Sequence, residues 1–345
     1  MRSSRVTCGE QVPAPMFKSE SGSKSMIADK CISPGEAVKR FIKDGSQIVL
    51  GGFTITRNPM AMVHEIIRQG VKDLHLVQHS HGMGLDLLIG AGCVKRLEIA
   101  YGGNGRFAPT CIRFRKAVCS GQIEVEDYTN YHMALRFLAG GMGIPFIPTK
   151  SGLGTDIVRV EGFGEVTRQE KKVAGQKLKV MENPFSENQD RVILLPALTP
   201  DVAIIHAQCV GEDGTVRIQG LTFADIEEAK SAGAVIVTCE EIVPASFIRL
   251  NPDVNCLPPF LVDAIVCVPY GAHPTACHFF YDYDAQHLNM YKSVAGDDAR
   301  FRAYLDEWVF GVSNHTAYMD KLGGAKVIEL RANPAYGYAP GIDRR

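Results

Sequence analysis

Several features that would assign a sequence to a known class at once are missing here. The 345 residues carry a formal net charge of -1, so there is no basic excess to attract the phosphates of nucleic acid. No uninterrupted apolar run is long enough to span a bilayer. The ten cysteines are scattered and none form a C-x-x-C pair, so neither a zinc ribbon nor a sequential redox motif stands out. We expect reduced, mostly buried thiols and a cytoplasmic protein.

The common nucleotide-binding and hydrolase motifs are absent as well. The chain contains no G-x-x-x-x-G-K-[ST] loop, no G-x-G-x-x-G between a strand and a helix, and no G-x-S-x-G elbow. What is present is the composition of an ordinary globular protein, with 46% hydrophobic and 22% charged residues. Evidence for a site therefore has to come from the turns that follow the expected strands.

Residues 1–30 differ from the rest of the chain. They are rich in serine and lack both a hydrophobic period and the apolar core of a secretory signal, so we expect a disordered tail or a tag. From residue 31 onward, strand-like and helix-like runs alternate without a Gly/Pro-rich linker. We therefore predict a single α/β domain over residues 31–345, with an open, mostly parallel sheet flanked by helices. A polar stretch, residues 162–190, predicts a small excursion from this domain, either two-stranded or made of helix and loop.

Residues 47–70 read as a strand, a glycine turn and a helix. Asn58-Pro59 is typical of a helix start, because the Asn side chain can cap a free N–H and Pro fits the first helical position. Gly51 and Gly52 follow the strand, and without side chains they let the backbone approach a ligand closely. The N-terminus of the helix that comes next favours an anion. A tight turn that only packs the helix on the sheet explains the same residues equally well.

Two more polar turns follow the next two expected strands, at residues 78–84 and 102–105. The carboxyl ends of parallel strands meet at one edge of a sheet, so all three turns should share one rim. This convergence makes the rim a better candidate site than any one turn. Arg57, in the first turn, adds a fork of donors for a carboxylate or phosphate.

Two groups of side chains contain the elements of a metal site: His79, His81 and Asp86, and the weaker His273, Cys277 and His278. Polar rim residues on an extended loop, and packing, are the simpler explanations, and we expect no bound metal. Glu240-Glu241 could supply acid/base chemistry, but the first turn of a helix is the preferred interpretation.

Ser33-Pro34 should open the first helix, and the remaining elements are expected from hydrophobic period alone. Residues 107–139 should be mainly helical, with basic residues that form a solvated face or, less expectedly, contact a phosphate. Residues 191–195 should be a strand of the main sheet. A helix around residues 298–310 and a strand at residues 326–330 should close the chain.

Many short blocks, in order from about residue 32 to about residue 338, match one family. They are Gly51-Gly52-Phe53-Thr54, Leu88-Ile89-Gly90, Phe114-Arg115-Lys116, Glu126-Asp127-Tyr128, Pro145-Phe146-Ile147-Pro148, Asn183-Pro184-Phe185, residues 201–208, 213–218, 237–242, 269–274 and 281–284, and Glu307-Trp308-Val309-Phe310. This set resembles the class I CoA-transferases, and within them the A (alpha) subunits of the glutaconate CoA-transferase type. Blocks in register over most of the chain are far more specific than any single one.

The resemblance implies a ping-pong transfer of CoA between carboxylic acids, with coenzyme A as a substrate and no cofactor. A glutamate attacks the acyl-CoA thioester, and an acyl-glutamyl anhydride and then a glutamyl-CoA thioester form. In the family this glutamate lies in a Ser-Glu-Asn-Gly motif of the B subunit. Ser186-Glu187-Asn188 imitates the motif, but Gln189 follows instead of glycine, so we interpret Glu187 as a coincidence. The chain should therefore need a B-type partner in an A/B hetero-oligomer.

The same resemblance places substrate- and CoA-binding residues in the three turns. They are Gly51, Gly52, Phe53, Thr54, Arg57, Gln78, His79, Ser80, Gly103, Asn104 and Gly105. Backbone N–H groups of the first turn would help hold the thioester oxyanion, Arg57 would meet a substrate carboxylate, and Asn104 would face the acyl group. No catalytic residue is expected in this chain.

Two departures from the family pattern fall where the acyl group would be selected. Residues 78–82 read Gln-His-Ser-His-Gly in place of glycines and alanines, and Gly105 replaces a serine. The identity of the carboxylic acid substrate therefore stays open. Related A/B pairs include ring-cleaving acyl-CoA hydrolases whose A chain supplies a glutamate, and Asn130 at that place argues against their chemistry. A thioester hydrolase and a non-catalytic partner-binding chain are the alternatives.

Overall fold

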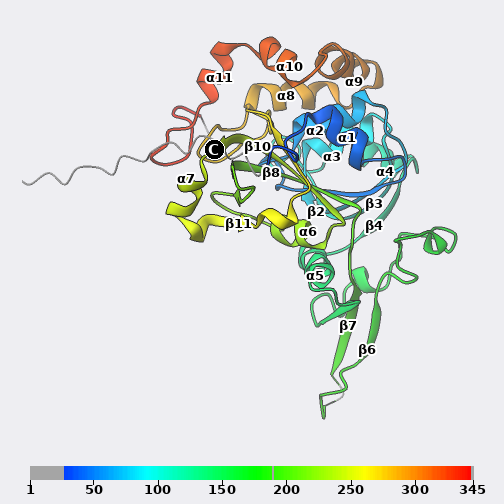
Figure 1. Ribbon diagram of the computed structural model, residues 1–345. Helices are drawn as coiled ribbons and strands as arrows, with labels where there is room; N and C mark the ends of the chain where they lie inside the picture. Colours follow the sequence, from blue (N-terminus) through cyan, green and yellow to red (C-terminus); the bar gives the residue numbers. More distant parts are fainter. Residues whose placement is uncertain (1–26, 189, 343–345) are drawn as a thin grey trace, which may run out of the picture.

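The computed structural model describes residues 27–188 and 190–342, so the expected tail over residues 1–30 lies almost wholly outside the described residues. A nine-stranded sheet forms the centre (Figure 1). Its main strands run in the order β4-β3-β2-β1-β8-β10-β12, and every neighbouring pair among them is parallel. β9 pairs antiparallel with β8, and β11 pairs antiparallel with β9.

The strands of this sheet are β1 (Gln47–Leu50), β2 (Leu74–His81), β3 (Val94–Gly102), β4 (Glu124–Asp127), β8 (Val202–Gly211), β9 (Val216–Arg217), β10 (Ala234–Val243), β11 (Asn255–Leu257) and β12 (Ala264–Cys267). The helices are α1 (Pro34–Phe41), α2 (Met60–Arg68), α3 (Met83–Gly90), α4 (Ile112–Cys119), α5 (Asn130–Gly141), α6 (Asp225–Ser231), α7 (Ala245–Leu250), α8 (Ala285–Val294), α9 (Asp298–Leu305), α10 (His315–Leu322) and α11 (Gly324–Leu330). The predicted α/β class is confirmed. Among the described helices, none has both the length and the apolar character that a bilayer crossing requires.

The sheet separates two hydrophobic cores, because successive side chains of a strand point to opposite faces. Ile48 and Leu50 of β1 pack with residues of α2, α3, α8 and α9, whereas Val49 packs with residues of α5 and α6. Figure 1 shows α1–α3 between the sheet and the outer layer that begins with α8, with α5 and α6 on the opposite side. Each fully buried Ile or Leu contributes about 1.5–3 kcal/mol, so the two cores hold the strand ends in fixed positions.

The predicted helix boundaries are mostly confirmed, with one correction. Ser33 caps α1 by accepting a 3.1 Å hydrogen bond from the N–H of Glu36. Gly70 ends α2 in the left-handed conformation, with φ +69°. Asn58, in contrast, does not cap α2. Its side chain instead lies 3.5 Å from the N–H of Gly84 and ties the first turn to the start of α3.

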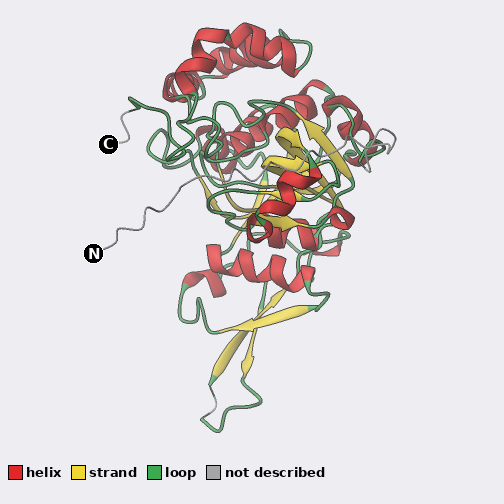
Figure 2. Ribbon diagram, turned by 60° about the vertical axis from the view of Figure 1, so that its left-hand side comes forward, coloured by secondary structure: helices red, strands yellow, loops and turns green. Residues whose placement is uncertain are grey.

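The excursion from the main layer is a second, antiparallel sheet in the order β5-β7-β6. Its strands are β5 (Phe146–Thr149), β6 (Lys179–Glu182) and β7 (Arg191–Pro196). The prediction that residues 191–195 belong to the main sheet is therefore wrong. This sheet projects from the body beyond α5, and Glu187 lies in the β6–β7 turn at its far end (Figures 1 and 2).

Helices α4 and α5 make up most of residues 107–139, as predicted, although strand β4, which was not predicted, lies between them. A second prediction from hydrophobic period is wrong. Residues 326–330 belong to helix α11 and not to a strand. The helix around residues 298–310 is confirmed as α9, which a π-helical turn over 306–310 continues.

Candidate functional site

The three predicted turns do meet at the carboxyl edge of the sheet. Thr54 forms a parallel bridge with His81, and the N–H of Gly103 donates to the carbonyl of His81 over 3.0 Å. A Cβ atom on Gly82 would lie 2.2 Å from the carbonyl oxygen of Thr54 and 2.4 Å from Oδ1 of Asn104, so only glycine fits where the turns touch. The prediction of a common rim is confirmed. β2, however, runs through His81, so residues 79–81 are strand and not loop.

The anion that the first turn holds is a carboxylate of the protein itself. Asp225, the first residue of α6, accepts a 2.6 Å hydrogen bond from the N–H of Gly52 and a 2.5 Å bond from the guanidinium of Arg57. A Cβ atom on Gly51 would lie 2.4 Å from Oδ1 of Asp225. Gly52 adopts φ +86°, and a Cβ there would lie 2.4 Å from the carbonyl oxygen of Thr56. The two glycines therefore admit Asp225 rather than an external ligand.

Arg57 is buried, and its guanidinium makes three hydrogen bonds within the protein. Besides Asp225, it donates to the carbonyl of His206 at 3.0 Å and to the carbonyl of Leu221 at 2.8 Å. Because Asp225 already neutralises it, these contacts do not support the predicted role of Arg57 as the ligand of a substrate carboxylate. Arg57 instead joins the first turn to β8 and α6.

The N–H groups of the first turn are largely engaged too. Gly51 donates to the carbonyl of Ile204 at 2.9 Å, and Phe53 donates to the carbonyl of Thr56 at 2.8 Å. Together with the bond from Gly52 to Asp225, these contacts leave fewer free donors for an oxyanion than the sequence suggested. The turn is therefore held rigidly by its own hydrogen bonds and offers few free N–H donors to a ligand.

A cavity of about 220 Å³ opens beside this turn. It is lined by Thr56, Arg57, Gln219, Gly220, Leu221, Phe223, Ala276, His278, Tyr281, Asp282, Gly337 and Tyr338. Three residues in or next to this lining are non-glycine residues in the left-handed region: Arg57 (φ +52°), Phe223 (φ +49°) and Phe279 (φ +70°). Such conformations cost about 1–3 kcal/mol each and concentrate at functional sites. The cavity and the adjoining rim are therefore the candidate site.

The side chains at the rim form an aromatic surface. Phe53 and Phe223 stack with ring centroids 4.6 Å apart, and the His79 ring lies 5.9 Å from Phe53. Burial lowers the pKa of His79, so its imidazole is neutral near pH 7. Nδ1 of His79 has no hydrogen-bond partner among the described residues. This surface suits an uncharged acyl group better than a phosphate.

Of the other predicted side chains, Gln78 and Ser80 make hydrogen bonds within the protein, whereas Asn104 does not satisfy all of its polar atoms. The amide of Gln78, in the orientation that satisfies both groups, pairs with the N–H and carbonyl of Leu50 at 3.0 Å each, so Gln78 extends the sheet. Ser80 donates a 2.8 Å hydrogen bond to Oδ1 of Asn130 at the start of α5. Oδ1 of Asn104 is buried and finds no hydrogen-bond partner among the described residues. Asn104 and His79 thus each hold a buried polar atom without a hydrogen-bond partner among the described residues, and Gly105 follows Asn104 in the third turn.

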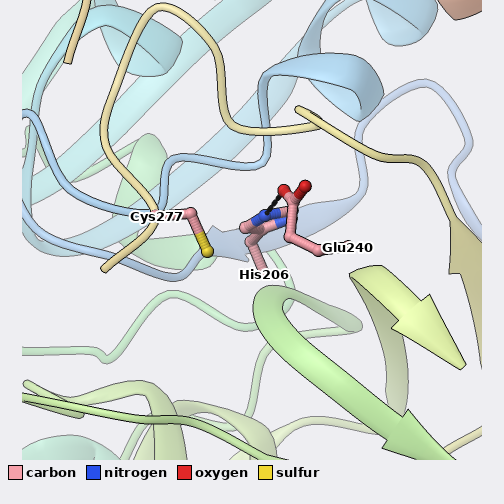
Figure 3. A group of neighbouring side chains, drawn as sticks. All are labelled: His206, Glu240 and Cys277. Atoms are coloured by element: carbon pink, nitrogen blue, oxygen red, sulfur yellow. Dashed lines mark hydrogen bonds and ion pairs between the residues drawn. The ribbon is translucent and has the colours of Figure 1, made fainter. Parts of the chain in front are cut away.

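A buried hydrogen-bond network adjoins the cavity through Tyr281. Nε2 of His206 lies 2.8 Å from Oε1 of Glu240 (Figure 3), and the Tyr281 hydroxyl donates to the same oxygen at 2.6 Å. The N–H of Tyr270 donates to Oε2 of Glu240, also at 2.6 Å. Both oxygens of the Glu240 carboxylate are hydrogen-bonded within the protein, which agrees with the structural role that the sequence favoured. The expected location was wrong, because Glu240 lies within β10 and not at a helix start.

Two groups among the described residues combine metal-ligand types: His206, Glu240 and Cys277, and His273, Asp284 and His287. In the first group, burial raises the pKa of Cys277 well above its usual value, so the thiol stays protonated and is a poor ligand. In the second, Asp284 caps α8 and lies 3.2 Å from His273, whose Nδ1 lies 2.6 Å from the Tyr318 hydroxyl. Both groups are satisfied as hydrogen-bond networks.

Asp86, which the sequence grouped with His79 and His81, serves another helix. Its carboxylate accepts hydrogen bonds from the N–H groups of Ile112 and Phe114, at 3.2 and 2.8 Å, at the start of α4. The Tyr291 hydroxyl donates to it at 2.7 Å. Asp86 therefore fixes α4 against α3 and α8, and the proposed grouping with the two histidines is wrong.

Three residues of the site, Asp225, Phe223 and Tyr281, were not predicted from the sequence. Asp225 follows a turn and opens an acidic helix start, a pattern that predicts helix capping and not contact with a turn 173 residues earlier. Phe223 and Tyr281 carry no spacing signal at all. Their roles depend on chain segments that only the folded sheet brings together.

Comparisons with known proteins agree with this geometry. The family model described as Coenzyme A transferase matches residues 32–268. The chain is 39% identical over 310 residues to the A subunit of glutaconate CoA-transferase from Acidaminococcus fermentans, covering 90% of this chain and 97% of that protein. It is 34% identical over 296 residues to the A subunit of 3-oxoadipate CoA-transferase from Pseudomonas knackmussii, covering 84% and 97%.

Solved structures give the same result. The crystal structure of glutaconate coenzyme A-transferase from Acidaminococcus fermentans superposes with a TM-score of 0.87 at 39% identity, covering 91% of this chain and 98% of that one. The decarboxylase AibA/AibB superposes with a TM-score of 0.67 at 33% identity, covering 80% and 97%. The chain belongs to the Coenzyme A transferase family. Within that family it is similar over most of its length to A subunits.

Proposed function

We propose that this chain is the A subunit of a heteromeric CoA-transferase, which moves CoA between an acyl-CoA and a free carboxylic acid. The observation that carries the proposal is its 39% and 34% identity to A subunits, over 90% and 84% of the chain. The partner is a B-type subunit, and both substrates bind where the two chains meet. Coenzyme A is a substrate, and the reaction needs no further cofactor.

The engagement of the site carboxylates supports a nucleophile on the partner. Asp225 is held by Gly52 and Arg57, and Asp282 in the cavity accepts from the N–H groups of Tyr283 and Ala339 at 3.1 and 3.2 Å. A nucleophilic carboxylate needs a free oxygen aimed at the thioester carbon. Glu187 lies at the far end of the β5-β7-β6 sheet and not at the rim, so it does not meet this need (Figure 1).

The proposed chemistry follows from placing the nucleophile on the partner subunit and the acyl-binding surface on this chain. A partner glutamate attacks the thioester carbonyl, CoA-thiolate leaves, and an acyl-glutamyl anhydride forms. The thiolate then attacks the glutamyl carbonyl, which releases the first acid and leaves CoA on the partner. The second acid reverses these steps. This chain supplies the stacked Phe53–Phe223 surface, together with His79 and Asn104, against the acyl group.

We also propose a cytoplasmic location, which the nine free cysteines among the described residues support. A ring-cleaving hydrolase is the less favoured alternative. A Rhodococcus jostii protein named cholesterol ring-cleaving hydrolase IpdA subunit is 26% identical over 289 residues. The resemblance implies a glutamate in the A chain of such enzymes, whereas Asn130 stands here and accepts from Ser80.

Reconstitution tests the proposal. The full chain is assayed alone and after co-expression with a B-type chain, with an acyl-CoA and a panel of acceptor acids. We expect CoA transfer only from the complex and only with an acceptor acid present. Transfer by the chain alone would contradict the division of labour. Release of CoA without any acceptor would favour a hydrolase, and release of CO₂ a decarboxylase.

A further inference from the structure

Two cysteines on neighbouring strands lie side by side on the sheet. Cys239 of β10 and Cys267 of β12 are directly opposite each other in parallel register. Neighbouring strands lie about 4.7–4.9 Å apart, which is within the roughly 4.4–6.8 Å between Cα atoms that a disulfide spans. Residues directly opposite each other on neighbouring parallel strands project to the same face of the sheet, so the two side chains lie next to each other.

The two thiols differ in exposure. Cys239 is fully buried, whereas Cys267 is exposed on the edge strand. Cys267 borders a hollow of about 530 Å³ that residues such as Ser33, Glu65 and His315 also line. A small oxidant in solvent can therefore reach Cys267 first, and Cys239 only through it.

The contacts around Cys267 favour its thiolate. The hydrogen bond from Cys239 is the largest cause that lowers the pKa of Cys267 to about 7, and the N–H of Ile242 adds to it, whereas burial and the nearby carboxylates of Glu240 and Glu241 raise it. The nearby exposed Cys31, which bridges β12 at Ile265, has a raised pKa, mainly because of burial. Among these three cysteines, the nucleophilic thiolate is that of Cys267.

We propose that Cys239 and Cys267 form a peroxide-reactive dithiol site, in which Cys267 is the attacking sulfur and Cys239 the resolving one. The Cys267 thiolate attacks one oxygen of hydrogen peroxide, the O–O bond breaks, and a sulfenic acid and hydroxide form. The Cys239 sulfur then attacks the sulfenic sulfur. The S–S bond forms, the S–O bond breaks, and hydroxide leaves. With the two thiol protons, two hydroxides become two waters. Two thiols are oxidised by two electrons, and peroxide is reduced.

Peptide mapping tests the site in the full chain. Reduced protein is treated with stoichiometric hydrogen peroxide, blocked with iodoacetamide, digested and analysed by mass spectrometry. We expect a peptide pair joined through Cys239 and Cys267 that dithiothreitol separates again. Cys267→Ser should lose the pair, whereas Cys119→Ser, at an exposed thiol at the end of α4, should keep it. Equal melting temperatures of the two variants show that both are folded.

A second readout separates reactivity from oxidation. The rate of alkylation at Cys267 should rise with pH around a midpoint near 7, and Cys239→Ala should move that midpoint upward because the hydrogen-bond donor is lost. The proposal is overturned if peroxide leaves both thiols free, if Cys267 links to Cys31 instead, or if Cys119 reacts as fast as Cys267. An alkylation midpoint unchanged by Cys239→Ala would likewise overturn it.

Discussion

The carboxylate of Asp225 accepts a 2.6 Å hydrogen bond from the backbone N–H of Gly52, although 173 residues separate the two in sequence. The same carboxylate neutralises Arg57, and both side chains are almost completely buried. One internal anion thus sets the shape of the turn on which the candidate site is built. The glycines leave space for this anion.

Removal of this anion should unfold the site. In Asp225→Asn the guanidinium of Arg57 is left buried without a counter-charge, and breaking such a pair costs about 3–5 kcal/mol. Asp298→Asn is the control, because Asp298 pairs with Arg113 but is 74% exposed. Chemical denaturation should show a large loss for the first variant and a much smaller one for the second. Similar losses would contradict the central role of Asp225.

The space around Gly52 predicts a second contrast. Gly52 and Gly45 both have positive φ, +86° and +76°, but a Cβ on Gly45 meets nothing within 4 Å. Gly45→Ala should therefore cost only the left-handed penalty of roughly 1–2 kcal/mol. Gly52→Ala adds a collision with the carbonyl oxygens of Thr56 and Arg57, so it should also abolish turnover by the reconstituted complex. The measurements are thermal melts and CoA-transfer assays of both variants, and equal behaviour would refute the close fit.

Glu228 should make the protein less stable as pH rises. Burial and the nearby Asp225 raise the pKa of Glu228 well above its usual value, so the folded state keeps a proton that the unfolded state releases. Above about pH 4.5 the unfolded chain binds fewer protons, and the free energy of unfolding falls with increasing pH. Glu228→Gln should remove this slope and raise the melting temperature at pH 8. Glu227→Gln on the same helix is the control, and an identical pH profile for both variants would contradict the assignment.

His64 should make the protein sensitive to acid. Burial is the main cause that lowers the pKa of His64 well below 6.5, and its Nε2 has no partner among the described residues. The unfolded state binds a proton below about pH 6.5 that the folded state refuses, so stability is lost as pH falls through that value. His64→Leu should flatten the melting-temperature profile between about pH 5 and 6.5. A profile as steep as that of the wild type would show that other groups carry the effect.

The sequence predicted well what local patterns decide. Ser33 caps its helix, Gly70 ends one, and alternating apolar runs place three turns on one rim. Local patterns fail where charges lie inside a strand. β4 was missed because three of its four residues, Glu124, Glu126 and Asp127, are acidic, and the fold accepts the buried carboxylate of Glu126 because Arg168 pairs with it at 2.5 Å.

The roles of the site residues were harder to predict, because they depend on distant partners. Arg57 has the chemistry of a carboxylate ligand, and nothing near it in sequence indicates that Asp225 occupies it. A run such as Val327-Ile328 favours a strand by propensity, yet it forms helix α11 with Ile328 75% exposed. In both cases tertiary contacts, and not residue type, determine the outcome: the partner of Arg57 in the first, and the secondary structure of Val327-Ile328 in the second.

The most direct test of the account asks which chain carries CoA during turnover. The reconstituted complex is incubated with an acyl-CoA, the reaction is stopped, and peptides with covalently bound CoA are mapped by mass spectrometry. We predict the CoA thioester on a glutamate of the B-type partner and none on this chain. A CoA thioester on Glu187, or on any other carboxylate of this chain, would contradict the account.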